Sequence, residues 1–139
     1  MSQSPAAATA AVTLLVVAKA PRPGAVKTRL AADLGEIGAA RVAAAALLDT
    51  ILVVGAVFDR RVLALAGDLA DTGGIDTSAI RAGLSHWQRI GQCSGSLGDR
   101  LARAHLDAAR LVWPADDRPA RVLQIGMDTP HVTASALAA

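Results

Sequence analysis

The chain has 139 residues, a length typical of one domain that buries its own hydrophobic core. Hydrophobic residues make up 53% of it and aromatic residues only 2%, so Leu, Val, Ile and Ala must form that core. A formal net charge of +2 gives the molecule little long-range attraction for nucleic acid or acidic membranes, so neither is expected as a partner. The single cysteine, Cys93, excludes an internal disulfide and favours a reducing, cytoplasmic location.

The beginning of the chain predicts a tail followed by a buried strand. Residues 1–11 are small and are expected to form a disordered tail, and residues 12–139 are expected to form one domain. Residues 12–18 are a continuous apolar run, typical of a strand that is buried on both faces. No Lys or Arg precedes this run, which argues against a signal peptide, and no apolar run approaches the ~20 residues that span a bilayer.

Helices and strands are then expected to alternate. The periodicity predicts helices over 37–54 and 97–112, and a last helix from Ala134 that Thr133 could cap. Further strands are predicted at 61–66 and 122–126, with a possible short strand near Ile80. This order predicts an α/β fold with an open, mostly parallel sheet, whose ligands bind beyond the carboxyl ends of the strands.

A cationic loop follows the first strand. Its cationic side chains are Lys19, Arg22, Lys27 and Arg29, two prolines stiffen it, and Gly24 permits close approach of a ligand. Arginine and lysine suit phosphate oxygens, so the loop is a candidate nucleotide-phosphate site. It is not a Walker A loop, because Pro21 and Val26 stand where that motif needs glycine. A solvated basic loop is the alternative interpretation.

Two further segments belong to the same edge of the expected sheet. Asp128 follows the strand at 122–126, where a carboxylate could hold a divalent cation or could serve as an ordinary turn residue. Residues 92–100 contain a Ser- and Gly-rich segment and the start of the helix predicted at 97–112. A segment of this kind at the N-terminus of a helix can bind an anion. Alternatively, Ser96 simply caps that helix.

Three motifs resemble a known family. Residues 18–30 (AKAPRPGAVKTRL), 97–101 (LGDRL) and 125–130 (IGMDTP) resemble domain of unknown function 2064, within the glycosyltransferase-A, or nucleotide-diphospho-sugar transferase, superfamily. The resemblance implies a three-layer α/β/α sandwich with a mostly parallel sheet, here the Rossmann-like, nucleotide-binding half of a glycosyltransferase-A fold. The family continues beyond the point where this chain stops, so the domain is expected to be truncated at its C-terminus.

The resemblance also implies roles for particular residues. Asp128 would hold Mg²⁺ or Mn²⁺ against the diphosphate and, with Lys27, would be catalytic. The expected nucleotide-binding residues are Lys19, Gly24, Lys27, Arg29, Gln92, Leu97 and Gly98, of which Gln92, Leu97 and Gly98 would lie near the base or ribose. Gly126 stands where the first aspartate of a DxD pair would be, which departs from the superfamily pattern.

The expected function is therefore that of a nucleotide-sugar-dependent glycosyltransferase-like protein that binds a nucleoside diphosphate sugar with a divalent metal. A nucleotidyltransferase is one alternative, because guanylyltransferases have a loop similar to residues 27–30 (KTRL) after their first strand. The other alternative is a non-catalytic nucleotide-binding module that has lost its acceptor half. An exposed sheet edge would favour self-association, so a homo-oligomer is possible.

Overall fold

The computed structural model describes residues 12–111, 121–127 and 133–138. The expected tail, residues 1–11, lies outside these ranges. The elements in chain order are β1 (Val12–Lys19), α2 (Thr28–Val57), β2 (Arg60–Ala66), α3 (Ser78–Gly83), β3 (Gln88–Gly91), α4 (Leu97–Ala109), β4 (Arg121–Gly126) and α5 (Ala134–Ala138). Each strand except β3 starts and ends within one residue of its expected range, because Val, Leu, Ile or Ala residues are concentrated in all three.

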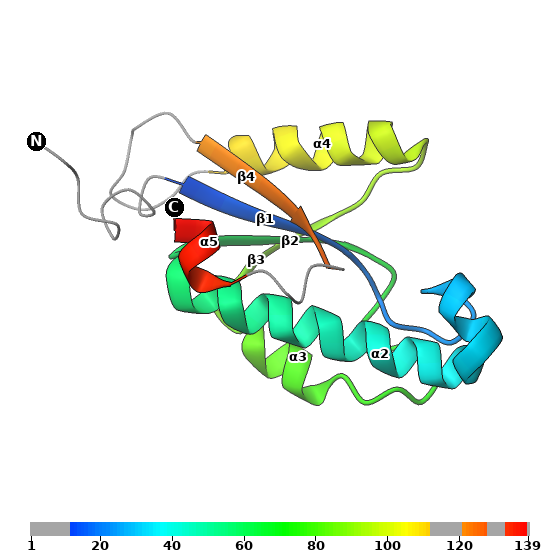
Figure 1. Cartoon of the computed structure of the whole chain (residues 1–139). Coiled ribbons are helices and arrows are strands. Elements are labelled where there is room, and N and C mark those ends of the chain that lie inside the picture. The colour runs from blue at the N-terminus through cyan, green and yellow to red at the C-terminus, as the bar shows by residue number, and fades with distance from the viewer. Residues whose placement is uncertain (1–11, 112–120, 128–132, 139) are drawn as a thin grey trace, which may run out of the picture.

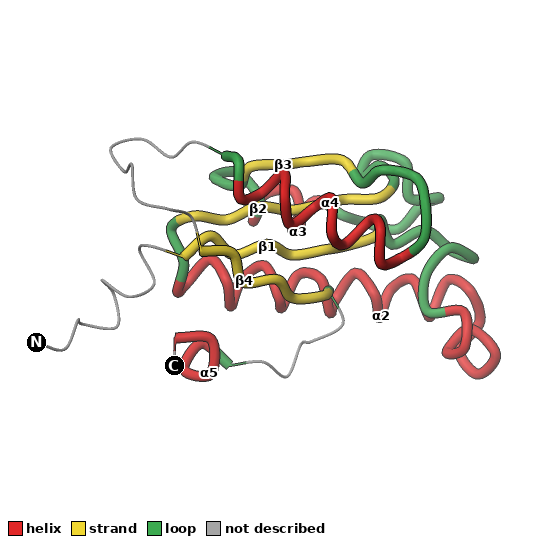
Figure 2. The backbone as a smooth tube through the Cα atoms, turned by 90° about the horizontal axis from the view of Figure 1, so that it is seen from above, coloured by secondary structure: helices red, strands yellow, loops and turns green. Residues whose placement is uncertain are grey.

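The four strands form one parallel sheet in the order β3-β2-β1-β4. The chain first moves from β1 outward to β2 and β3, and then returns past β1 to β4. Because parallel crossovers are right-handed, this reversal places α2 and α3 on one face of the sheet and α4 on the other (Figure 1), and Figure 2 shows the four strands side by side in the order given. The expected three-layer α/β/α sandwich is therefore confirmed.

The core has two parts, because successive side chains of a strand face opposite sides of the sheet. Leu14 and Val16 of β1 pack with Leu47 and Ile51 of α2. On the other face, Leu15 packs with two small residues of α4, Ala104 and Ala108, and with Val62 and Ala64 of β2. Each fully buried Leu, Ile or Val side chain contributes about 1.5–3 kcal/mol to the stability of the fold, so the helices on both faces stabilise the sheet.

Helix α2 is longer than the helix expected over 37–54, because a short helical segment precedes it. The two segments join at Gly35, whose backbone is not helical (φ 76°, ψ 165°) and whose positive φ suits glycine. Figure 1 shows the short segment set at an angle to the long one. The helix ends at Val57, and the next residue, Phe58, is extended and its N–H donates to Val54 O.

Helix α2 is also long and apolar enough to cross a membrane by length and composition. Arg29–Val57 contains an 18-residue window with a mean hydropathy of 1.9, which corrects the expectation that no stretch approaches the requirement. The expectation was wrong because Arg41 and Asp49 interrupt the apolar run without making the helix polar. In the structure 44% of this window is buried, and a core helix of a soluble protein passes the same test.

The segment between β2 and α4 differs from its expected structure. Ile80, near which a short strand was expected, is the buried residue of helix α3, and the strand β3 comes later, at Gln88–Gly91. Strand β3 lies at the edge of the sheet and Ile90 is its single apolar residue. Such a strand lacks the apolar run by which the other strands are predicted. Helix α4 ends at Ala109, shorter than its expected range of 97–112.

Candidate functional site

The strand order reverses between β1 and β4, so the carboxyl ends of these two strands mark the switch point of the sheet. Ligands of open α/β sheets bind in the crevice beyond such a point. Here Met127 N donates to Val17 O at 3.2 Å, and Lys19 N donates to Met127 Sδ at 3.2 Å. Asp128, the expected metal ligand, is the next residue along the chain and lies outside the described residues.

The loop after β1 is held against the loop after β2. Ala20 N donates to Ala66 O at 2.8 Å, which extends the pairing of the two strands by one bond. Gly67 (φ 87°) lies so close that a Cβ placed on it would be 3.0 Å from Ala20 Cβ. A side chain at this position would push the two loops apart.

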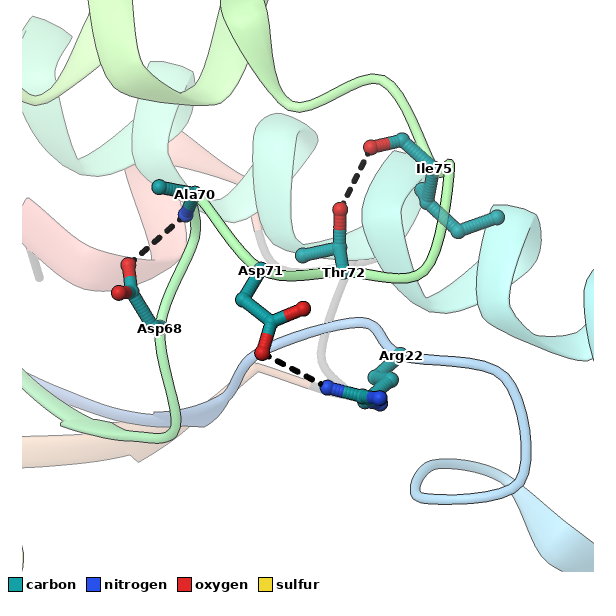
Figure 3. A network of polar contacts seen from close by, with 6 residues as sticks. All are labelled: Arg22, Asp68, Ala70, Asp71, Thr72 and Ile75. Carbon is teal, nitrogen blue, oxygen red and sulfur yellow. Dashed lines mark hydrogen bonds and ion pairs between the residues drawn. The ribbon is translucent and has the colours of Figure 1, made fainter.

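An ion pair also joins these two loops. Arg22 Nη1 lies 2.9 Å from Asp71 Oδ2, as Figure 3 shows. The loop that carries Asp71 is fixed by its own hydrogen bonds: Asp68 Oδ1 accepts from Ala70 N at 2.8 Å, and Thr72 Oγ1 donates to Ile75 O at 2.7 Å. The stiff β2 loop therefore positions the Arg22 guanidinium of the β1 loop.

A pocket of about 340 Å³ lies at the carboxyl ends of β1 and β2. Two cations and two carboxylates line it together with small residues: Lys19, Arg22, Asp68, Asp71, Ala20, Ala25, Ala66 and Gly67. The paired charges suit a ligand that offers both an anionic group and hydroxyl groups. Sequence reasoning missed Asp68 and Asp71 as site residues, although the position of Asp68 just after a strand was a usable signal.

The loop after β2 lines a second, neighbouring pocket. It has a volume of about 490 Å³ and is lined by residues 69–77 and Arg81. Two buried threonines shape it: Thr72 bonds to Ile75 O, and Thr77 Oγ1 donates to Leu69 O at 2.6 Å. Both hydroxyl protons are therefore used within the loop.

Three of the expected phosphate-binding residues, Gly24, Lys27 and Arg29, do not line the pocket at the carboxyl ends of β1 and β2. Lys27 is the residue before α2 and has a left-handed backbone (φ 48°), which among the described non-glycine residues is found only here. Arg29 is exposed in the first turn of α2. Gly24 lies against the carboxylate of Glu36, whose oxygens are 3.4 Å from the position of a Cβ on that glycine.

The other expected nucleotide contacts lie where β3 leads into α4. The Gln92 amide contacts the ends of two strands, with Nε2 donating to Ala18 O at 2.8 Å and to Ala64 O at 3.1 Å. Leu97 and Gly98 are exposed at the start of α4. Ser96 caps this helix, since its Oγ accepts from Asp99 N at 3.1 Å, which confirms the alternative interpretation of that serine.

Comparison with solved structures supports a nucleotide-sugar transferase fold. A putative nucleotide-diphospho-sugar transferase from Desulfovibrio desulfuricans G20 superposes with a TM-score of 0.70 and 25% sequence identity. The match covers 92% of this chain and 52% of the other, so this chain spans about half the length of that protein.

Comparison by sequence identifies the family. None of the curated proteins matches the chain. A family model does match it, over residues 52–139, and the family is described as uncharacterized protein conserved in bacteria (DUF2064). This match includes the second and third motifs of the sequence, at 97–101 and 125–130. Because the family model matches more than half of its length, the chain belongs to the DUF2064 family.

Proposed function

We propose that the protein binds a nucleoside diphosphate sugar at the carboxyl edge of the sheet and takes part in glycosyl transfer from it. The observation that carries the proposal is the pocket in which the β1 and β2 loops bring Lys19 and Arg22 together with Asp68 and Asp71. Its volume of about 340 Å³ falls within the range of small-molecule sites. The likeness to a nucleotide-diphospho-sugar transferase supports this ligand class.

The cations and the carboxylates of the pocket would contact different parts of such a ligand. The Lys19 ammonium can meet phosphate oxygens, and carboxylate oxygens of Asp68 and Asp71 can accept hydrogen bonds from ribose hydroxyls. An acidic residue near the end of the second strand has this role in dinucleotide-binding sheets. Lys27, Arg29 and the backbone at Gly24 would extend the phosphate site along the loop, with Lys27 as the catalytic cation.

A divalent metal is part of the proposal. Within the described ranges, no three His, Cys, Asp or Glu side chains gather to hold an ion. Asp128, which follows β4, would hold Mg²⁺ or Mn²⁺ together with the phosphates of the nucleotide, because carboxylate and phosphate oxygens suit both ions. When bound, the ion would offset the negative charge that develops on the departing diphosphate.

A thermal-shift panel tests the proposed function. It contains UDP-, GDP-, ADP- and CDP-sugars and nucleoside triphosphates, each with and without Mn²⁺. A nucleotide sugar should raise Tm in the presence of metal, because a ligand that binds only the folded state stabilises it, by about 2.7 kcal/mol at a hundred times Kd. Asp128→Asn should abolish the metal-dependent part. If no nucleotide raises Tm at millimolar concentration, the proposal is wrong.

The same panel separates the second candidate, a nucleotidyltransferase. Its support is the similarity of residues 27–30 to the first-strand loop of guanylyltransferases. Stabilisation by a triphosphate and not by any nucleotide sugar would favour it. Binding of a nucleotide sugar without turnover in any acceptor assay would instead indicate a non-catalytic binding module.

A further inference from the structure

A polar network joins the start of α4 to the carboxyl ends of β1 and β2. Gln92 is its centre, because its Nε2 donates to Ala18 O and to Ala64 O. Both amide protons of Gln92 are used in this way, and its Oε1 lies 3.5 Å from Arg100 Nη1. The network therefore holds the Arg100 guanidinium near the end of β1.

Unlike Arg22 and Arg103, Arg100 has no acidic partner among the described residues. Arg22 pairs with Asp71, and Arg103, one turn further along α4, pairs with Asp107 at 3.1 Å. Among the residues that the structure describes, no carboxylate lies within 4.0 Å of Arg100. Its Nε is shielded from solvent and has no hydrogen-bond partner. A buried donor of this kind costs free energy unless an acceptor reaches it.

Lys19 brings a second cation to the same corner of the sheet. In β1 the odd-numbered residues Leu15 and Val17 face α4. Lys19 ends the strand at the next odd position, so it lies on the face that carries α4. It is exposed, and it follows Ala18, the residue whose carbonyl oxygen accepts from Gln92.

We propose that Arg100 and Lys19 together bind a phosphate group on the α4 side of the sheet edge, with Gln92 as the positioning residue that orients Arg100. The planar guanidinium fits phosphate oxygens with two parallel hydrogen bonds, and Lys19 adds a mobile positive charge. This inference rests on the proposed function, since it names a residue of α4 that would hold the diphosphate of the same ligand.

The test compares two arginines of one helix with inorganic pyrophosphate as the probe. Isothermal titration calorimetry on Arg100→Met should show affinity lower by about tenfold or more, because a charged hydrogen-bonding partner of the anion is lost. The matched control Arg103→Met should stay within about twofold, since an exposed cation contributes little. Arg100→Lys keeps the positive charge but not the planar guanidinium, so its pyrophosphate affinity should fall less than that of Arg100→Met.

Protein stability gives the second readout. Arg100→Met should leave Tm unchanged or raise it, because it replaces an uncompensated charge by an apolar side chain of similar length. A lower Tm with unchanged pyrophosphate affinity would make Arg100 a structural residue and overturn the inference. Unchanged affinity in Arg100→Met overturns this inference alone. A wild-type protein that binds neither pyrophosphate nor any nucleotide overturns the proposed function as well.

Discussion

The ion pair between Arg22 and Asp71 orders the candidate site more than it stabilises the fold. Its two side chains are 53% and 70% exposed, and an exposed pair contributes less than about 1 kcal/mol. Its effect is local, because it links loops that are 49 residues apart in sequence. It also neutralises one of the two cations that line the pocket.

Asp71→Asn should therefore tighten binding of pyrophosphate. The substitution removes a negative charge from the pocket and frees the Arg22 guanidinium, while the unfolding free energy changes by less than about 1 kcal/mol. Calorimetry and urea denaturation measure the two quantities. Asp107→Asn, which breaks the ion pair with Arg103 on α4, is the matched control and should leave the affinity unchanged. Weaker binding in Asp71→Asn would contradict the assignment of this pocket.

The carboxyl of Asp76 has a pKa below its ordinary value of 3.8. The main cause is the backbone N–H of Ser78, which donates to Asp76 Oδ1 at 2.9 Å, followed by the Ser78 hydroxyl and the positive charge of Arg81. The folded state thus favours the carboxylate. Its contribution to stability is present above pH 3.8 and is lost as the pH falls through the lower pKa of the folded state.

An NMR titration of the Asp76 carboxyl carbon should give a pKa below 3.8. Ser78→Pro removes the backbone donor at the first residue of α3 and should raise the pKa of Asp76 toward 3.8. Ser78→Ala keeps the backbone donor and should raise the pKa of Asp76 by a smaller amount. A pKa at or above 3.8 in the unmodified protein would refute the hydrogen-bonded geometry.

At the scale of elements, α2 combines a buried face with an apolar exposed face. Leu47 and Ile51 are 0% and 1% exposed against the sheet, whereas Leu52 is 57% exposed on the same helix. A helix that is apolar all round is usually covered on all sides. The packing of α2 can therefore be tested by comparing leucines of its two faces.

Leu47→Ala should lower the unfolding free energy by about 2–5 kcal/mol, because it leaves a cavity in the core. Leu52→Ala should lower it by less than about 1 kcal/mol, since this side chain has little burial to lose. Chemical denaturation of both variants measures the difference. Equal costs would contradict the packing of α2 on the sheet.

The elements differ in how well the sequence predicts them, and the reasons are physical. Strands β1, β2 and β4 are rich in Val, Leu, Ile or Ala and were predicted almost to the residue, while β3 has only the half-buried Ile90 and α3 only the buried Ile80, and neither was predicted. Lys19 was predicted as a site residue because it follows a strand. Asp71 was missed because its importance depends on an ion pair between two loops that no local pattern encodes, whereas the position of Asp68 just after β2 was a usable signal.

At the scale of the whole molecule, β3 and β4 lie at the two edges of the sheet that the described residues form. Strand β4 carries Leu123, which is 38% exposed, and a parallel edge of this kind is a template for pairing with another chain. We therefore predict self-association, to be measured by sedimentation equilibrium over a range of concentrations. Leu123→Lys should reduce it, and a monomer at all concentrations would contradict the prediction.

For the whole molecule, we place the ligand site at the carboxyl ends of β1 and β2. The position of the site is tested most directly by ¹H–¹⁵N correlation spectra recorded while a nucleoside diphosphate sugar is added. Mg²⁺ is the metal, because paramagnetic Mn²⁺ would broaden the signals. The perturbed amides should cluster at Lys19–Lys27, at 67–71 and at Arg100. Perturbations confined to the opposite edge, around Arg60 and Arg121, or none at saturating ligand, would contradict this placement of the site.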